Sequence, residues 1–426
     1  PGEVRSMAPS PLEGRSTMAS VWTGREMIVW GGEASERAFA DGAAYDPTTD
    51  TWRTLAPSPL SARNAPAVVW TGDEVLLWGG HGAGVGARDG AAYNPATDTW
   101  RPIADAPITS DGLPQAVWTG DEMVVIAGFN SVTAAAYDPR ADTWRTLPPV
   151  PGQPLGHEMR AIWTGTQMII RAAYRNAGPS MDMPGGLFAY TPEEDRWNEL
   201  PSSTRNEEFL TNLAFTGDYL LRVTQNPATA VVTRYDFDTE TWVGIATWPH
   251  DPTPLETSVW TGDQLLLWGG GSDAVLVDPE TGTVTETPAG DGPNRVYPAA
   301  VWADGILLIW GGWQDMNDGL LLRPLTPAPT NTPNTTFTVP QGDQPAATDG
   351  KRVRVDGPDG VRAYLDPTPG PVEVNGRLLP IQRVIDGDGN LVGYFACTFL
   401  PPDVVEGPDF DPDSACATVT TMQGGG

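Results

Sequence analysis

Residues 67–80 read AVVWTGDEVLLWGG, and this stretch decides the fold. Two short apolar runs flank a Thr-Gly-Asp turn, and a pair of glycines ends the second run. Short apolar runs bounded by Gly and Asp are typical of β-strands, and so short a turn is typical of a hairpin. Two further runs follow at residues 90–93 and 99–103, with an Asn-Pro turn between them. The segment therefore predicts four successive antiparallel strands.

The Val-Trp-Thr-Gly element of this segment recurs along the chain in near-copies, an apolar residue and an aromatic followed by Thr-Gly or a close variant. A four-stranded sheet of this kind buries both of its faces only when neighbouring copies stack against it, so the repeat indicates a radial array. We therefore predict an all-β fold, a seven-bladed β-propeller over residues 1–325. The aromatic residue of the element stands at seven positions that are 42 to 52 residues apart: Trp22, Trp70, Trp118, Trp163, Phe215, Trp260 and Trp302.

The seventh repeat lacks a fourth strand of its own. Residues 319–322 supply its third strand, and a Pro-rich segment follows. The missing strand is found at the other end of the sequence, because residues 8–12 and 56–60 both read APSPL and the second copy follows a fourth strand. Residues 4–7 are therefore predicted to pair beside residues 320–322. Such an N-terminal strand closes the ring and removes a free sheet edge.

Glycine pairs and spaced aromatics recur with the same register. They resemble the kelch-repeat β-propeller family, of the secreted bacterial type, whose repeat carries Gly-Gly after the second strand and Tyr and Trp on the third and fourth. The resemblance covers residues 1–325 and weakens in blades three to six, where Val277 and Val284 stand for Tyr and Trp in the sixth. Large aromatics at such positions are expected to pack between blades. The recurring residues are Gly31-Gly32, Gly79-Gly80, Gly269-Gly270 and Gly311-Gly312, and Tyr45 with Trp52, Tyr93 with Trp100, Tyr137 with Trp144, Tyr190 with Trp197 and Tyr235 with Trp242.

The chain is strongly acidic. Its 54 acidic and 25 basic residues give a formal net charge of −29, and Lys351 is its one lysine. Such a surface repels nucleic acid and anionic membranes, and no apolar stretch approaches the roughly 20 residues of a membrane span. Neither partner is expected. Few lysines, acidity and a pair of cysteines favour an extracellular or cell-surface protein, while acidity alone also fits a saline habitat.

The C-terminal quarter differs from the repeats. Residues 326–340 are rich in Pro and Thr, which predicts an extended linker, and residues 341–426 are expected to form a small β module. Cys397 and Cys416 lie there and are predicted to form a disulfide worth on the order of 3 kcal/mol, with two free thiols as the alternative. Residues 386–390 resemble the start of a calcium loop but lack its downstream Glu, so a plain turn and no cofactor are expected.

Three arginines share one offset from the first-strand tryptophan. Counting back seven residues gives Arg15, Arg63 and Arg295, which belong to the neighbouring blades one, two and seven. In kelch proteins this position often carries Arg and lines the mouth of the central channel, so the resemblance implies a site for an anion or carboxylate. The alternative is that each Arg pairs with a local carboxylate or carbonyl and holds its loop. The same offset gives Asp111 in blade three and Glu208 in blade five.

Loops that differ among similar repeats are where repeat proteins place specificity. The longest runs over residues 171–186 in blade four and contains Tyr174 and Arg175. Trp313 in blade seven and Phe129 in blade three lie in equivalent loops. Exposed aromatics at a channel mouth suit contact with a sugar or a peptide, with capping of the blade as the alternative. Tyr174, Arg175 and Trp313, together with His157 and Glu208, therefore join the arginines in the candidate ligand site.

Two functions follow from these residues. The first is a secreted, non-catalytic recognition or scaffold protein that binds a protein, peptide or glycan on the loop side of the propeller, with the C-terminal module joining subunits into a homo-assembly. The second is a kelch-type mutarotase or lyase acting on an acidic sugar, in which His157 or Glu208 moves protons. The three histidines lie in different repeats without metal-ligand spacing, and no nucleophile-elbow or phosphate-loop motif is present, so the first is preferred.

Overall fold

The structure is a computed structural model whose chain divides into two units, Pro1–Leu325 and Thr326–Gly426. The first unit is described over residues 3–324 apart from residues 36, 83–85, 130, 153–154, 174–184, 202–211, 226–228, 238, 250–254, 256, 270–273, 288–294 and 314, and without the side chains of residues 155–158, 173 and 185. In the second unit only the backbone of seven strands is described.

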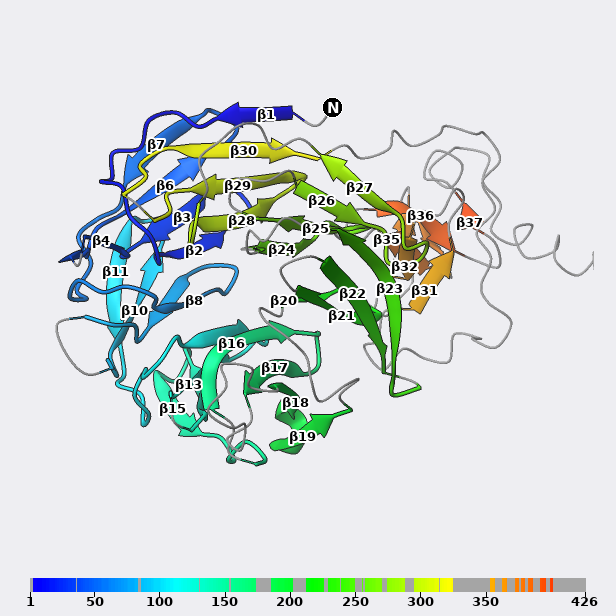
Figure 1. The fold of residues 1–426 in the computed structure, drawn as a ribbon, viewed down its shortest axis with the longest axis horizontal. Coiled ribbons are helices and arrows are strands. Elements are labelled where there is room, and N and C mark those ends of the chain that lie inside the picture. The colour runs from blue at the N-terminus through cyan, green and yellow to red at the C-terminus, as the bar shows by residue number, and fades with distance from the viewer. Residues whose placement is uncertain are drawn as a thin grey trace, which may run out of the picture. The chain divides into compact units, whose positions relative to one another are not determined.

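Seven four-stranded antiparallel sheets surround a common centre in the first unit (Figure 1). The fold is therefore a seven-bladed β-propeller, as the repeat predicted. First strands of successive blades contact one another from β28 through β2, β8, β12, β16 and β20 to β24, so they form the inner layer. The strands are β2 (Ala19–Trp22), β3 (Met27–Trp30), β6 (Gly42–Asp46) and β7 (Thr51–Thr54) in blade one; β8 (Ala67–Trp70), β9 (Val75–Trp78), β10 (Gly90–Asn94) and β11 (Thr99–Ile103) in blade two; β12 (Gln115–Trp118), β13 (Met123–Ala127), β14 (Thr133–Asp138) and β15 (Thr143–Thr146) in blade three; β16 (Leu155–Trp163), β17 (Met168–Ala173), β18 (Gly185–Thr191) and β19 (Arg196–Leu200) in blade four; β20 (Asn212–Phe215), β21 (Tyr219–Gln225), β22 (Thr229–Asp236) and β23 (Thr241–Pro249) in blade five; β24 (Thr257–Trp260), β25 (Leu265–Trp268), β26 (Ala274–Val277) and β27 (Val284–Thr287) in blade six; and β28 (Ala299–Ala303), β29 (Ile306–Trp310), β30 (Gly319–Arg323) and β1 (Glu3–Ser6) in blade seven.

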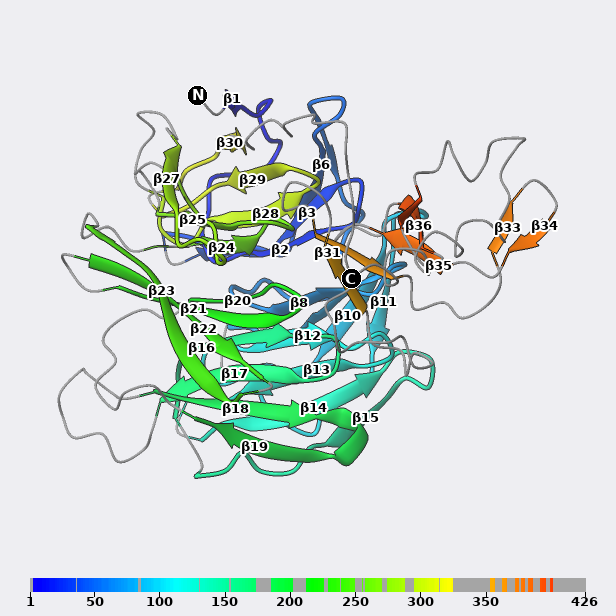
Figure 2. The same cartoon turned by 90° about the vertical axis from the view of Figure 1, so that its right-hand side faces the viewer.

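The N-terminal strand closes the ring, as predicted from the repeated APSPL segment. Strand β1 pairs antiparallel with β30, with Val4 opposite Leu322 and Ser6 opposite Leu320. Figures 1 and 2 both show β1 beside β30, at the outer edge of blade seven. The backbone N–H of Met7 continues the ladder with a 2.9 Å bond to Gly319 O. The segment thus supplies the outer strand that the last repeat lacks.

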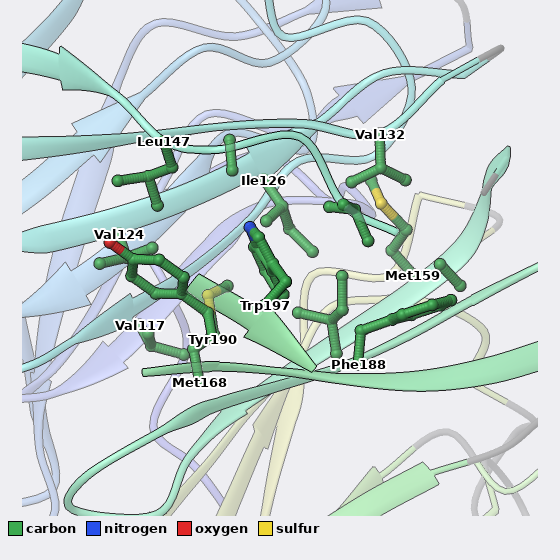
Figure 3. Packing of buried hydrophobic residues seen from close by; sticks show 14 of the residues in the cluster. Val117, Val124, Ile126, Val132, Leu147, Met159, Met168, Phe188, Tyr190 and Trp197 are labelled. Atoms are coloured by element: carbon green, nitrogen blue, oxygen red, sulfur yellow. The ribbon is translucent and has the colours of Figure 1, made fainter. Parts of the chain in front are cut away.

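Apolar clusters fill the spaces between blades. Among the described residues there are seven, and each joins two neighbouring blades, including one between blades seven and one. Figure 3 shows the cluster between blades three and four, where Ile126, Met168 and Trp197 lie in one core. The second and third strands have apolar residues on both faces, because each face meets another blade. Packing between blades is therefore the main role of the recurring aromatics.

A polar clamp accompanies this packing on the outer strands. In blade two, Tyr93 Oη donates to Asp98 Oδ1 at 2.7 Å, and Asp98 Oδ1 also accepts the N–H of Ala56, from the segment that leaves blade one, at 3.0 Å. Trp100 Nε1 donates to the carbonyl oxygen of Ala56 at 2.9 Å. Arg53 of blade one adds a 2.9 Å bond to Tyr93 Oη. Burial raises the pKa of Tyr93 to about 12.

Blade six departs from this clamp in all three of its residues at once. Val277, Gly282 and Val284 stand where blade two has Tyr93, Asp98 and Trp100. The middle position keeps a positive φ, +71° at Gly282 against +51° at Asp98, so the turn itself is conserved. Val277 has no hydroxyl that could donate a hydrogen bond to an aspartate in the turn. Glycine adopts the positive φ of the turn without strain, so no aspartate is needed there.

The structure adds elements that the repeat did not predict. Strands β4 (Glu33–Ala34) and β5 (Arg37–Ala38) form a small hairpin in blade one, and a 3₁₀ turn spans Pro192–Glu194 in blade four. In the second unit, β31 (Val353–Asp356), β32 (Arg362–Leu365), β35 (Gln382–Ile385), β36 (Leu391–Phe395) and β37 (Phe399–Leu400) form one sheet, and β33 (Val372–Val374) pairs with β34 (Arg377–Leu379).

Candidate functional site

The two faces of the propeller carry different connections. Because each blade is an antiparallel meander, the segment that enters its first strand and the connection between its second and third strands lie on the same face, which we call the loop face. The turn face carries the Thr-Gly turns. There Thr71 Oγ1 accepts the N–H of Glu74 at 3.0 Å, and Gly72 adopts a φ of +103°. The residues proposed from the sequence that the structure describes with their side chains, Arg15, Arg63, Arg295, Phe129 and Trp313, belong to the loop face.

Arg63 is almost entirely buried, with an exposed fraction of 2%. Its Nη1 donates to Gly79 O at 3.2 Å and to Asp89 Oδ1 at 2.8 Å. Its Nη2 donates to Asp89 Oδ2 and to Ser61 Oγ, both at 2.9 Å, and its Nε donates to Ser61 O at 3.0 Å. Every nitrogen of this guanidinium therefore has an acceptor within the chain.

Arg15 and Arg295 are both 0% exposed and repeat most of the arrangement, although Nε of Arg295 has no acceptor among the described residues. Each donates to the carbonyl of the first glycine of its own Gly-Gly pair and to an aspartate just before its third strand. Arg15 Nη1 lies 3.3 Å from Gly31 O and 2.6 Å from Asp41 Oδ1, while Arg295 lies 2.9 Å from Gly311 O through Nη1 and 2.8 Å from Asp318 Oδ2 through Nη2.

The glycine pairs connect these arginines to the preceding blade. Gly32 N donates to Arg63 O at 2.9 Å, and Gly312 N donates to Arg15 O at 2.9 Å. Gly31 has a φ of +70°, and a Cβ there would lie 2.7 Å from Arg63 O, so no larger residue fits. We call each set of Arg, Gly-Gly and Asp a blade lock. Blades seven, one and two each have one, and the glycine bonds between locks join blade seven to blade one and blade one to blade two at the loop face.

This geometry matches the alternative that each arginine holds its loop. An anionic ligand would have to displace an aspartate from a bidentate or charge-assisted pair before reaching a guanidinium. The ligand role of Arg15, Arg63 and Arg295 stays a prediction. Hydrogen bonds from Arg63 lower the pKa of Asp89 below its ordinary value, and burial opposes this only in part.

Blade three shows a shift in the repeat. Ser110 N donates to Ala87 O at 3.1 Å, just as Arg63 N donates to Phe39 O at 3.0 Å. Ser110 rather than Asp111 therefore takes the arginine position, because the segment before Trp118 is one residue longer. Its hydroxyl donates to Gly80 O at 3.0 Å and so keeps the link to blade two without a charge.

Exposed apolar side chains gather on the loop face. Trp313 is 60% exposed and Tyr297 49%, and a 2.9 Å bond from Trp313 N to Val296 O holds the two segments together in blade seven. In blade three, Leu113 is 43% exposed and Phe129 is 49% exposed; Phe129 takes the position of Trp313, and Leu113 follows Gly112, which takes the position of Tyr297. In the described part of the chain, Val243 on β23 is the one other large apolar residue exposed to this extent.

Tyr297 has an uncommon backbone conformation. Its φ is +52°, a region that costs a bulky residue about 1–3 kcal/mol. Thr17 and Ala65 take the same position in blades one and two, and Thr17 N donates to Tyr297 O at 3.1 Å while Ala65 N donates to Thr17 O at 2.7 Å. These residues form a hydrogen-bonded rim where the inner strands begin. A tyrosine on that rim therefore places an aromatic ring where blades one and two have Thr17 and Ala65.

Sequence reasoning found Trp313 and Phe129 but missed Tyr297 and Leu113. The signal for Tyr297 was present, because it stands two residues after Arg295, where Arg15 and Arg63 are followed by Thr17 and Ala65.

Several sequence predictions lie outside the described residues. These are the ligand roles of Tyr174, Arg175 and Glu208, the disulfide between Cys397 and Cys416, the linker at 326–340 and the turn at 386–390. His157 belongs to β16, but only its backbone is described.

Within the described parts of both units, no three His, Cys, Asp or Glu side chains come together in a way that suits a metal ion. The same parts contain no helix with the length and hydropathy to cross a bilayer. Neither a scan against models of known protein families nor a search of curated proteins finds a match to this chain.

Proposed function

We propose that this chain is a non-catalytic recognition or scaffold protein of the kelch type, acting outside the cell, which binds a protein, peptide or glycan on the loop face of its propeller. The observation that carries the proposal is that four of the five large apolar residues exposed in the described part of the chain lie on the loop face, two in blade seven and two in blade three. Tyr297 and Trp313 in blade seven, and Leu113 and Phe129 in blade three, are solvent-exposed on one face. Large exposed apolar side chains that gather on one surface are typical of an interaction site.

The blade locks favour binding over catalysis. An enzyme acting on an acidic sugar would use Arg15, Arg63 and Arg295 to hold the carboxylate, yet each guanidinium is already bound to an aspartate of its own blade. A rigid rim with fixed loops suits recognition, because little order must be gained when a ligand binds.

The test compares ligand binding by loop-face variants with binding by a variant elsewhere. The probes are a glycan array and a displayed library of random peptides. A Trp313→Ser, Tyr297→Asn double variant should bind every selected ligand at least about tenfold more weakly, which corresponds to about 1.4 kcal/mol. Asn is chosen at residue 297 because it tolerates a positive φ.

Val243→Ser is the matched control, because it removes an exposed apolar side chain from an outer strand and leaves the loop face unchanged. It should bind like the parent protein. Equal affinity of the double variant and the parent for all selected ligands would contradict the proposed function.

The proposed homo-assembly concerns the second unit. We propose that Thr326–Gly426 joins subunits; the support is that it forms a unit of its own beside a ring that the N-terminal strand already closes. Sedimentation analysis of the full chain and of a chain ending at residue 325 tests this. Equal monomer mass for both chains would contradict it.

A further inference from the structure

In the blades with blade locks the exposed charges of the loop face are mostly negative, although Arg37 and Arg88 are also exposed there and arginines stand at its repeated positions. In each blade lock the guanidinium is at most 2% exposed, whereas the side chains of Asp41, Asp89 and Asp318 are 59%, 47% and 62% exposed. A ligand approaching this face therefore meets the carboxylates first.

Further carboxylates extend this surface. Glu13, with a side chain 69% exposed, and Asp315 lie at the border between blades seven and one, and Ser35 Oγ donates to Asp315 Oδ2 at 2.9 Å. Arg37, whose side chain is 61% exposed, forms an ion pair with Glu13 and stacks on Phe39, with its Cζ 4.6 Å from the ring centroid. The guanidinium of Arg37 is thus partly neutralised, and acidic groups predominate around the two exposed aromatics of blade seven.

The apolar pairs restrict the size of the ligand. Tyr297 with Trp313 and Leu113 with Phe129 are separated along the ring by blades one and two. A ligand that touches both pairs must be a chain rather than a small molecule. Between the two pairs, such a chain would pass the exposed lock aspartates Asp41 and Asp89 of blades one and two.

Resting on the proposed function, we propose that the loop face binds a cationic polypeptide segment in which Lys or Arg alternates with apolar residues. Cationic groups would stack on Trp313 and Tyr297 and pair with Asp315 and the lock aspartates. The chain itself contains a cation–π contact of this kind, in which the Cζ of Arg15 lies 3.6 Å from the centroid of the Phe39 ring. Apolar side chains of the segment would lie on Leu113 and Phe129.

The test uses fluorescent peptides of about 12 residues, which extend over about 40 Å. One set alternates Arg or Lys with Leu, and the matched set carries Glu in place of each basic residue; a glycan array is run in parallel. The cationic set should bind and the acidic set should not. The affinity of the cationic set should fall at least about fivefold when salt is raised from about 0.05 M to 0.3 M, because screening weakens exposed charge pairs.

Two variants with equal charge separate a local site from general attraction to an acidic protein. Asp315→Asn removes one loop-face carboxylate, and Asn suits the φ of +56° at this position. Asp73→Asn removes one carboxylate from the turn face. The first should weaken cationic peptide binding by about threefold and the second should leave it unchanged.

The outcomes distinguish this inference from the proposed function. One outcome overturns the cationic-peptide inference and leaves the proposed function standing. In that outcome a neutral glycan binds, Trp313→Ser abolishes glycan binding, and Asp315→Asn does not change the binding of any ligand. If Asp73→Asn and Asp315→Asn weaken peptide binding equally, attraction is general and the inference is again overturned. If no ligand of any class responds to Trp313→Ser, both are wrong.

Discussion

Breaking one blade lock from either side should have unequal effects, and this tests the structural role of the arginines. Asp89→Ala leaves the Arg63 guanidinium, 2% exposed, without its carboxylate, and isolating a buried charge in this way costs about 3–5 kcal/mol. Arg63→Met removes the buried charge while filling most of its volume. The remaining Asp89 side chain is 47% exposed and keeps contact with water, so the expected cost is about 1–2 kcal/mol from lost hydrogen bonds.

The assay is equilibrium urea denaturation followed by tryptophan fluorescence, with Asp73→Ala on the turn face as the control. The control should lie within about 0.5 kcal/mol of the parent protein. Asp89→Ala should be less stable than Arg63→Met by about 2 kcal/mol. If Arg63→Met is the less stable of the two, the ion pair is not what stabilises the loop.

The same pair predicts a pH dependence. Because Arg63 lowers the pKa of Asp89 in the folded state, the unfolded state takes up a proton first as the pH falls. The stabilisation is complete above the unfolded pKa of about 3.9 and is lost as the pH falls through the folded value. Arg63→Met should therefore lose less stability than the parent protein between about pH 5 and pH 3. Parallel stability curves for the two proteins over that range would contradict this reasoning.

Three further predictions concern the ring. Deleting residues 3–12 exposes the edge of β30 and should cause self-association. A synthetic peptide of residues 3–12 should restore the monomer. A truncated chain that is monomeric and stable would show that the N-terminal strand is not needed to close the ring. Burial raises the pKa of Tyr93 to about 12, so its phenol should ionise at 295 nm near pH 12, and stability should decline from about pH 10, where the unfolded state loses its proton, up to that folded value; ionisation at pH 10 in the folded protein would be inconsistent with burial. Gly31→Ala should destabilise more than Gly72→Ala, because both have positive φ but only a Cβ at residue 31 meets a neighbouring backbone atom, 2.7 Å away.

The architecture was predictable because its cause is repeated in the sequence. The aromatic residue that ends each first strand, such as Trp70, recurs seven times, and the APSPL segment occurs twice. Each has a local physical reason, so together they gave the seven blades and the N-terminal strand that closes the ring. The hairpin of β4 and β5 was missed because it occurs once and carries no repeated signal.

The candidate site was less predictable, because spacing gives the position of a residue and not its partner. The offset placed Arg15, Arg63 and Arg295 correctly on the loop face, but the aspartates that bind them lie 23 or 26 residues away along the chain. A single inserted residue in blade three also moved Ser110 into the position that counting assigned to Asp111. Which group faces solvent depends on burial, and this required the structure.

Photocrosslinking from residue 313 tests the central claim, that the loop face is the binding surface, most directly. Trp313 is replaced by a photoreactive phenylalanine derivative, and in a second protein Val243 is replaced in the same way; both side chains are solvent-exposed. Irradiation with the tightest-binding ligand from the peptide and glycan screens should produce a covalent complex from residue 313 and none from residue 243. Crosslinking from residue 243 alone would contradict the claim.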